Sequence, residues 1–253
     1  MGKPIAFITG ASQGIGAGIA LEMSKAGYDV AISYKSNRDK AMGVKADMEA
    51  YGAKTAVIHG DISSLADIDR MFEEFFASFD HVDVMVNNAG VTLVSPFLEA
   101  TPEIFETLTN TDWRGSYFCS QKAARNMVDK GVKGTIINIT SVHQAGCWQD
   151  ASIYGPTKAA LNKFTQHAAM ELAPYGIRVV SIAPGYTLVR ELTPRWQECH
   201  DNLNKHIPLG RFGEPREIGK ACVFLSGEGG AYITGTCIYM DGGALLPVAS
   251  DII

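Results

Sequence analysis

The residues best suited to chemistry are a serine, a tyrosine and a lysine between positions 141 and 158. If the segment after Ile153 is helical, Tyr154 and Lys158 stand one turn apart on the same face, because four residues nearly complete a turn. A free tyrosine hydroxyl has a pKa near ~10, so holding it ionised at neutral pH costs roughly 4 kcal/mol unless a positive charge lies beside it. Lys158 can supply that charge. Ser141 follows an apolar run, Thr135 to Ile139, that is typical of a strand, so its hydroxyl can point to the same place.

These three groups predict a proton donor and acceptor for an alcohol or a carbonyl compound. A Tyr and a Lys four residues apart are also a common stabilising pair on the surface of a helix, so the spacing alone leaves both interpretations open. The segments that precede and follow this stretch decide between them.

A glycine-rich turn near the N-terminus predicts a phosphate site. The apolar run Pro4 to Ile8 is typical of a buried strand, and a helix with apolar Ile19 and Met23 follows the turn. Glycines let the backbone approach a pyrophosphate, and the start of the helix supplies free N–H groups and a positive dipole end. The glycine spacing, G-xxx-G-x-G, departs from the plain G-x-G-x-x-G fingerprint, but its place between strand and helix is the expected one. The candidate cofactor contacts are Gly10, Ser12, Gln13, Gly14, Ile15 and Gly16.

The end of the second expected strand, Asp29 to Ser33, favours NADP over NAD. An acidic residue at this point would bind a ribose 2′-hydroxyl, and none is present. The chain has Tyr34, Lys35 and Ser36 instead, whose cation and hydroxyls suit a 2′-phosphate. NAD remains possible, because a basic loop can also be simply a solvated one.

Strand-like and helical segments alternate along the whole chain. This pattern predicts an α/β fold, a single-domain doubly wound parallel sheet of about seven strands with helices on both faces. The runs Thr55 to His59, Val82 to Val86, Arg178 to Ile182 and Thr236 to Met240 supply further strands. In such sheets ligands bind beyond the carboxyl ends of the strands. The cofactor candidates at those ends are Asp61, Ile62, Asn88, Ala89, Gly90, Pro184, Gly185 and Thr187. A helix after Ser63 or Ser64 carries a stripe of Leu65, Ile68, Phe72, Phe75, Phe76 and Phe79, which we interpret as core, and the polar stretch 189–208 as a lid over a substrate.

The composition excludes several classes of function. The chain has 253 residues, 46% of them hydrophobic, and a formal net charge of −5 without a block of like charges, which predicts a globular protein with no nucleic-acid partner. No apolar run reaches the ~18 residues that span a membrane, and no signal peptide precedes the first strand, so we expect no membrane partner and a cytoplasmic location. The five cysteines are spread without a metal-binding spacing, and no metal is expected.

Taken together, these motifs resemble the short-chain dehydrogenase/reductase family, over essentially the whole chain. The resemblance is carried by Thr9 to Gly16, Asp61, Asn87 to Gly90, Ser141, Tyr154 with Lys158, Pro184-Gly185 and Asp241 to Gly243, which occur in the family's order and spacing. It implies that Tyr154 is the acid/base, that Lys158 assists it and holds the nicotinamide ribose, and that Ser141 positions the substrate oxygen. It also implies a homotetramer.

One position departs from the family pattern. Asp112 stands where the family has an asparagine three residues before a glycine, here Gly115. A carboxylate there can hold a water that relays protons to Lys158, and it adds negative charge near the site. We include Asp112 among the catalytic candidates.

Within the family, three stretches resemble those of bacterial glucose 1-dehydrogenases and related sugar or polyol dehydrogenases: Ser141 to Gln144 with Trp148, the turn Tyr34 to Ser36, and the tail Asp241 to Pro247. His143, Trp148 and Tyr186 are the candidate substrate contacts, although His143 and Trp148 could equally be loop packing. A 3-oxoacyl thioester or a steroid ketone is the alternative small-molecule substrate. An alternative of another class is a nucleotide-binding regulatory protein without turnover.

Overall fold

A seven-stranded sheet with all neighbouring strands parallel forms the centre of the computed structural model, which describes residues 2–189 and 202–246. The strand order is β3-β2-β1-β4-β5-β6-β7. The strands are β1 (Ile5–Ile8), β2 (Asp29–Tyr34), β3 (Thr55–His59), β4 (Val84–Asn87), β5 (Thr135–Ile139), β6 (Arg178–Pro184) and β7 (Cys237–Met240). This confirms the predicted fold class.

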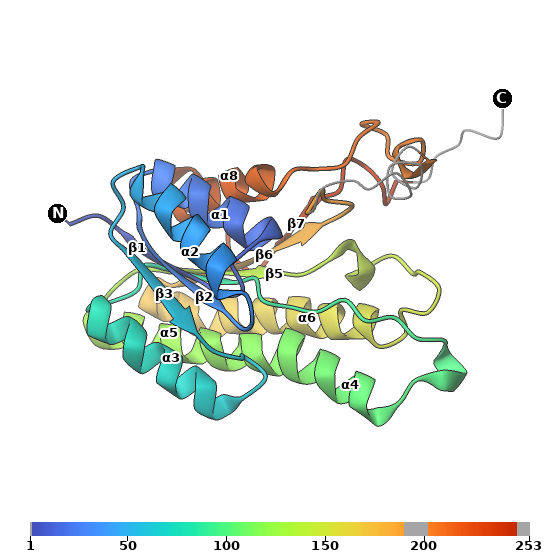
Figure 1. Ribbon diagram of the computed structural model, residues 1–253, viewed down its shortest axis with the longest axis horizontal. Coiled ribbons are helices and arrows are strands. Elements are labelled where there is room, and N and C mark those ends of the chain that lie inside the picture. Colours follow the sequence, from blue (N-terminus) through green and yellow to red (C-terminus); the bar gives the residue numbers. More distant parts are fainter. Residues whose placement is uncertain (1, 190–201, 247–253) are drawn as a thin grey trace.

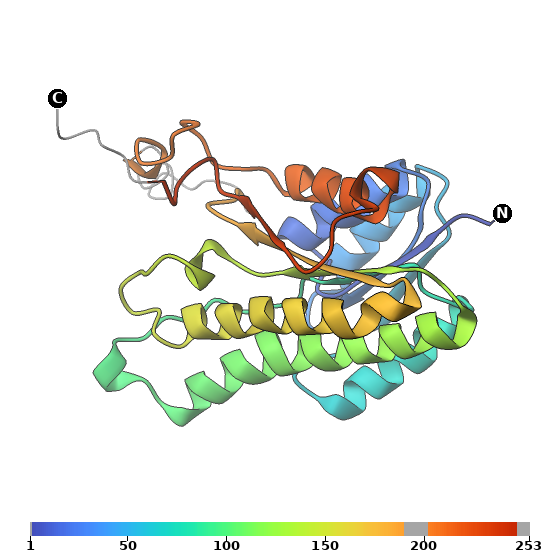
Figure 2. The ribbon, with the colours of Figure 1, turned by 180° about the vertical axis from the view of Figure 1, so that it is seen from behind.

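Helices cover both faces of the sheet (Figures 1 and 2). One face carries α1 (Gly14–Lys25), α2 (Arg38–Glu49) and α8 (Pro215–Ser226), and the other carries α3 (Leu65–Ser78), α5 (Ser116–Lys130) and α6 (Tyr154–Leu172). Before α5 the chain forms α4 (Pro102–Leu108) and a π-helical turn, η2 (Thr109–Gly115). Short 3₁₀ turns are η1 (Phe97–Glu99), η3 (Val142–Gln144), η4 (Ala173–Tyr175) and η5 (Glu228–Gly230).

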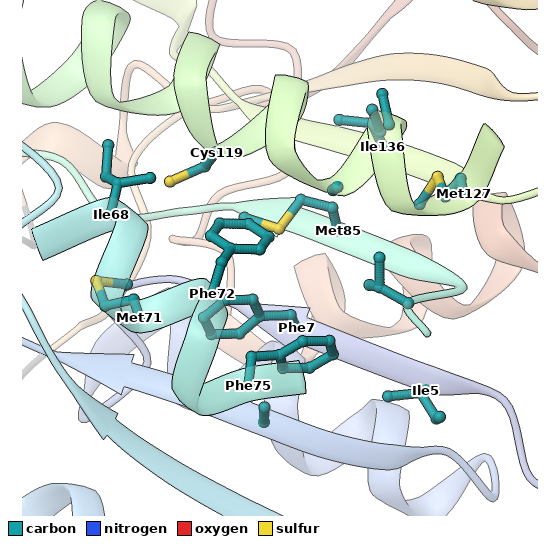
Figure 3. Packing of buried hydrophobic residues seen from close by; sticks show 14 of the residues in the cluster. Ile5, Phe7, Ile68, Met71, Phe72, Phe75, Met85, Cys119, Met127 and Ile136 are labelled. Atoms are coloured by element: carbon teal, nitrogen blue, oxygen red, sulfur yellow. The ribbon is translucent and has the colours of Figure 1, made fainter. Parts of the chain in front are cut away.

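The core is divided by the sheet into two layers, because successive side chains of a strand point to opposite faces. On the α3 side, Phe7 stacks on Phe75 with ring centroids 4.8 Å apart and meets the edge of Phe72 at 5.3 Å (Figure 3). On the α1 side, Ile8 packs in a cluster with Ile19 of α1. The aromatic stripe of α3 is thus core, as predicted, except that Leu65 at its start is 43% exposed.

Two segments differ from the sequence-based expectation. Helix α2 was not predicted, because it buries only three side chains, Ala41, Val44 and Met48, and its polar surface hides the helical pattern. The helical region after Pro102 contains a π turn, η2, which the sequence pattern did not indicate. Of the predicted lid, residues 190–201 lie outside the described part of the chain. No helix within residues 2–189 and 202–246 is both long and apolar enough to cross a membrane.

Candidate active site

The candidate residues meet at the carboxyl ends of β1, β4, β5 and β6. The helix after β1 packs on one face of the sheet and the helices after β4 pack on the other, so the strand order reverses between these two neighbouring strands. A crevice forms at such a reversal, and ligands of open α/β sheets bind there. The topology therefore brings the glycine-rich turn, Asn88, Ser141 and Pro184 to one edge, although they lie far apart in the sequence.

The glycine-rich turn is held against the end of β4 by side chains. The Thr9 Oγ1 accepts hydrogen bonds from the backbone N–H groups of Asn88 and Ala89, both at 3.1 Å. The Asn88 Nδ2 donates in return to the carbonyl oxygen of Gly10 at 3.0 Å. A Cβ on Gly16 would stand 2.5 Å from that Nδ2, so only glycine lets α1 start this close to β4. These hydrogen bonds make the turn a rigid cradle. This role of Thr9 was not predicted from the sequence.

The start of α1 fits the pyrophosphate of a dinucleotide. Gln13 occupies the N-cap position, but its side chain makes no capping hydrogen bond, so the first N–H groups of the helix are not satisfied by a cap. Gly14 follows with a φ of 59°, a left-handed conformation that favours glycine. These backbone donors and the positive end of the helix dipole suit an anionic group.

The expected adenosine end of the site contains an ion pair. The Lys35 Nζ lies 2.6 Å from Oδ2 of Asp61, whose other oxygen accepts from the Ser63 N–H at 2.9 Å. Burial alone would raise the pKa of the Asp61 carboxyl, but the hydrogen bonds from Lys35 and Ser63 lower it below its ordinary value. A second cation lies at the start of α1, where the Lys40 Nζ of α2 donates to Oε1 of Gln13 at 2.7 Å. Lys40 was not among the cofactor contacts predicted from the sequence, because helix α2, which carries it, was not predicted.

The other cofactor candidates at this end of the site are Tyr34, Ser36 and Ile62. Tyr34 is half-buried and meets the edge of the His59 ring at 5.3 Å, whereas Ser36 is exposed beside it. Ile62 is buried, and the close packing of Gly115 against its carbonyl would not tolerate a Cβ.

Tyr154 and Lys158 occupy the first turns of α6, as the spacing predicted. Both are buried, and the Lys158 Nζ lies 5.7 Å from the centre of the Tyr154 ring. The ammonium also donates to the carbonyl oxygen of Ile139, the last residue of β5, at 3.3 Å. Ser141 is buried just beyond β5, and its Oγ accepts from the His143 N–H at 3.3 Å. A largely buried tyrosine beside a buried ammonium is more than a surface helix pair, because the Lys158 ammonium has lost most of its contact with water and depends on the groups around it.

Asp112 contacts Lys158 directly, where the sequence suggested a bridging water. Its Oδ2 lies 3.0 Å from the Lys158 Nζ, as an ion pair rather than a well-aligned hydrogen bond, and its Oδ1 accepts from the Val91 N–H at 2.8 Å. Burial by itself lowers the pKa of Lys158, but the Asp112 carboxylate and the Tyr154 phenol outweigh it, so that the net direction is upward. Lys158 is therefore held in its charged form.

An aromatic chain extends from Tyr154 toward the surface. The His143 ring meets the edge of Tyr154 at 5.0 Å and stacks on Trp148 at 4.1 Å. The Trp148 indole N–H donates to the Tyr186 hydroxyl at 3.3 Å, and Tyr186 stacks on Phe212 at 5.4 Å. Burial lowers the pKa of His143, which favours its neutral form. This aromatic chain brings together the three predicted substrate contacts, His143, Trp148 and Tyr186. It also includes Phe212, which was not predicted from the sequence.

A cavity of about 380 Å³ lies beside this aromatic chain. Its wall includes His143, Trp148 and Asp150 of the loop after β5, together with Phe97 and Pro156. Ser141, Tyr154 and Lys158 are not part of its wall. His143 connects the cavity to the reactive groups, because it lines the cavity and its ring also meets the edge of Tyr154.

The last strand ends carry the remaining candidates. Pro184 ends β6, and a Cβ on Gly185 would come within 2.8 Å of the Asp241 backbone, so this turn packs tightly on the segment after β7. The Thr187 hydroxyl donates to the carbonyl oxygen of Gly185 at 3.2 Å. Thr187 thus points back toward the turn at the site edge.

Comparisons with known proteins agree with this geometry. Residues 10–244 match a family model described as enoyl-(acyl carrier protein) reductase. The chain is 34% identical over 238 residues to the 3-oxoacyl-(acyl-carrier-protein) reductase of Staphylococcus epidermidis, covering 94% of this chain and 97% of that one. It is 33% identical over 245 residues to the L-rhamnose 1-dehydrogenase (NAD(P)(+)) of a Sphingomonas species, covering 96% of each chain.

Solved structures give the same result. The acetoin dehydrogenase of Enterobacter cloacae superimposes with a TM-score of 0.89 at 33% identity and 98% coverage of both chains. A short-chain dehydrogenase/reductase from Serratia marcescens superimposes with a TM-score of 0.90 at 31% identity, covering 96% of this chain and 98% of that one. The crevice, the glycine-rich cradle and the buried tyrosine and lysine are thus those of a known group of oxidoreductases that act on alcohols and carbonyl compounds with a nicotinamide nucleotide: the chain belongs to the short-chain dehydrogenase/reductase family.

Proposed function

We propose that this enzyme reduces a carbonyl group of a small polar substrate, or oxidises the corresponding secondary alcohol, with Tyr154 as the proton donor and acceptor. The observation that carries the proposal is the buried pair of Tyr154 and Lys158 beside Ser141, at the edge of the sheet where the glycine-rich cradle lies. In the direction of reduction, Tyr154 gives its proton to the substrate oxygen while the Ser141 hydroxyl holds that oxygen. Lys158 stabilises the negative charge that develops on the phenol oxygen.

A bound nicotinamide dinucleotide would supply or accept the hydride, and the chain's own residues fix where it binds. The N–H groups at the start of α1 and the turn Gly10 to Gly16 suit the pyrophosphate. In this proposal, Asn88, Ala89 and Gly90 after β4 form one wall of the cofactor site, and Pro184, Gly185 and Thr187 at the end of β6 form the other. Lys158, held by Asp112 and Ile139, would bind the nicotinamide ribose.

NADP is the proposed preference. Lys35 and Lys40 bring two cations to the end of β2 and the start of α2, and no carboxylate directly follows β2 to bind a ribose 2′-hydroxyl. We do not assign Asp61 to the ribose 2′-hydroxyl, because its carboxylate forms an ion pair with Lys35. A 2′-phosphate would offer Lys35 a second anionic partner.

A sugar or polyol is the proposed substrate. Trp148 presents an indole that stacks well on the C–H face of a sugar, and Tyr186 and His143 place polar groups beside it. The L-rhamnose and acetoin dehydrogenases among the relatives also act on small hydroxylated or keto compounds, as their names state. The alternative, a 3-oxoacyl thioester, is favoured by the acyl-carrier-protein reductases among the relatives.

A substrate panel tests this proposal. Purified enzyme is assayed with NADPH and with NADH against keto sugars, acetoin-type ketones, acetoacetyl thioesters and steroid ketones, and with the oxidised cofactors against aldoses and polyols. We expect the highest kcat/KM with a sugar or polyol and NADP. Activity confined to acetoacetyl thioesters or steroids would overturn the substrate assignment, and no turnover with any compound would favour a regulatory nucleotide-binding protein.

Two further proposals are a homotetramer, which the family resemblance implies, and a cytoplasmic location, which the sequence favours. The outer surfaces of α4 to α6 support self-association, because they expose large apolar side chains: Phe105, Tyr117, Val128 and Met170.

A further inference from the structure

The pair of Asp112 and Lys158 is unusual because both charges are buried. The Asp112 side chain is fully buried, the Lys158 side chain is 6% exposed, and their charged atoms lie 3.0 Å apart. Removing two charges from water is costly, and the cost is offset only when the charges face each other and their remaining hydrogen-bonding capacity is used. A neutral residue at position 112 would leave the Lys158 ammonium buried without a counter-ion, so the carboxylate has to be explained together with the lysine it faces.

Asp112 links two walls of the site at one point. Its Oδ1 accepts from the N–H of Val91, directly after the wall formed by Asn88 to Gly90, and its Oδ2 faces Lys158. A Cβ on Gly90 would lie 3.1 Å from that Oδ2 and 3.2 Å from the Lys158 Nζ, so the backbone at Gly90 covers the pair closely. The π-helical turn η2 presents Asp112 to this point, and π turns within helices are frequent at functional sites.

We propose that Asp112 is a positioning residue, whose carboxylate fixes the Lys158 ammonium beside the Tyr154 ring and fastens the Gly90–Val91 wall to the same point. The proposal rests on the function proposed above and deepens it. The carboxylate does not touch the reacting atoms; it acts through Lys158. It also cancels part of the ammonium's field at the phenol, so the charge of residue 112 affects how strongly Lys158 can stabilise negative charge on the Tyr154 oxygen.

The groups that surround Lys158 come from several elements, and few of them carry charge. η2 contributes Asp112, α6 contributes Tyr154, β5 contributes the carbonyl of Ile139, and the loop after β4 contributes backbone at Gly90. η3 contributes His143, which faces the Tyr154 ring and which burial keeps in its neutral form by lowering its pKa. Among the described residues, Asp112 and Tyr154 are the groups whose charge raises the pKa of Lys158.

The test is Asp112→Asn. The amide oxygen can still accept from the Val91 N–H, whereas the negative charge is lost. Burial then acts on Lys158 without its counter-ion and lowers its pKa. We expect the alkaline limb of the pH–rate profile, where the ammonium is lost, to move to lower pH by about one unit or more, given that a close counter-charge shifts titration by about 1 to 3 units.

A second readout needs neither substrate nor cofactor. Protein with ¹³C at the lysine ε-carbons is titrated by NMR, and the Lys158 signal is identified by its loss in Lys158→Met. We expect the wild-type signal to be that of an ammonium at pH 10, and the Asp112→Asn midpoint to lie lower by about one unit or more. Asp129→Asn, which removes the same charge from the exposed end of α5, is the control and should leave the midpoint unchanged.

Each outcome supports or overturns the role of Asp112, and the failure of that role can be told apart from the failure of the proposed function. Equal midpoints for wild type and Asp112→Asn, or an equal shift in Asp129→Asn, overturn the role of Asp112 even if the enzyme is active. A lowered midpoint in a protein without turnover supports that role and overturns the proposed function. If Asp112→Asn does not fold, the wild-type titration alone decides, because a Lys158 midpoint below pH 10 contradicts a fixed ion pair.

Discussion

Replacement of Tyr154 by phenylalanine should lower kcat for the best substrate by about 10²- to 10⁴-fold, the range expected when a general acid is removed. The phenyl ring retains the packing against His143, so the fold and the cofactor site should persist. The measurement is steady-state kcat in both directions, together with NADPH affinity by fluorescence titration. The affinity should change less than about threefold, because the Tyr154 hydroxyl forms no hydrogen bond with the residues that the structure describes.

Tyr175→Phe is the matched control for this variant. Tyr175 lies just after α6 and is 55% exposed, so loss of its hydroxyl should leave kcat unchanged. Normal turnover in Tyr154→Phe would remove Tyr154 from the mechanism. A large loss of NADPH affinity would instead point to a structural role of the hydroxyl.

Replacement of Lys35 by alanine should weaken NADPH binding about tenfold and NADH binding less than about threefold. A charge-assisted hydrogen bond contributes about 1.5 to 3 kcal/mol when shielded, and Lys35 is 67% exposed, so the lower end applies. The variant also breaks the ion pair with Asp61, but that loss affects both cofactors equally. The ratio of the NADPH and NADH dissociation constants, measured by fluorescence titration, therefore reports the contact between Lys35 and the 2′-phosphate alone.

The control for Lys35→Ala is Lys130→Ala, which removes a charge from the exposed end of α5 far along the chain from β2. It should weaken neither cofactor. Equal weakening of NADPH and NADH in Lys35→Ala would refute NADP preference at this position and would mean that Lys35 acts only on Asp61.

The parts of the fold that could be predicted from sequence are those with a strong local signal. Buried strands such as Ile5–Ile8 are continuous apolar runs, and the glycines of the first turn mark a place where only glycine allows the backbone to approach Asn88. The four-residue spacing of Tyr154 and Lys158 predicted that both side chains lie on the same face of a helix. Helix α2 gave no such signal, because its exposed surface is polar and it buries few side chains.

The contacts within the site depend on segments that are distant in the sequence. Asp112 reaches Lys158 only because η2 and α6 pack side by side on the same face of the sheet, and the π turn, which periodicity does not reveal, sets its direction. Lys40 approaches Gln13 through α2, which was not predicted. Phe212 joins the aromatic chain through a ring contact between two loops that no local pattern connects.

The central claim is that a hydride moves between nicotinamide C4 and a substrate carbon. The most direct measurement is turnover of the best carbonyl substrate with NADPH that carries deuterium at C4, in each of its two stereoisomers, followed by mass spectrometry and NMR of the product. We predict deuterium on the new carbinol carbon from one stereoisomer and none from the other. Product without deuterium from either stereoisomer, or no product with any carbonyl compound, would contradict the claim.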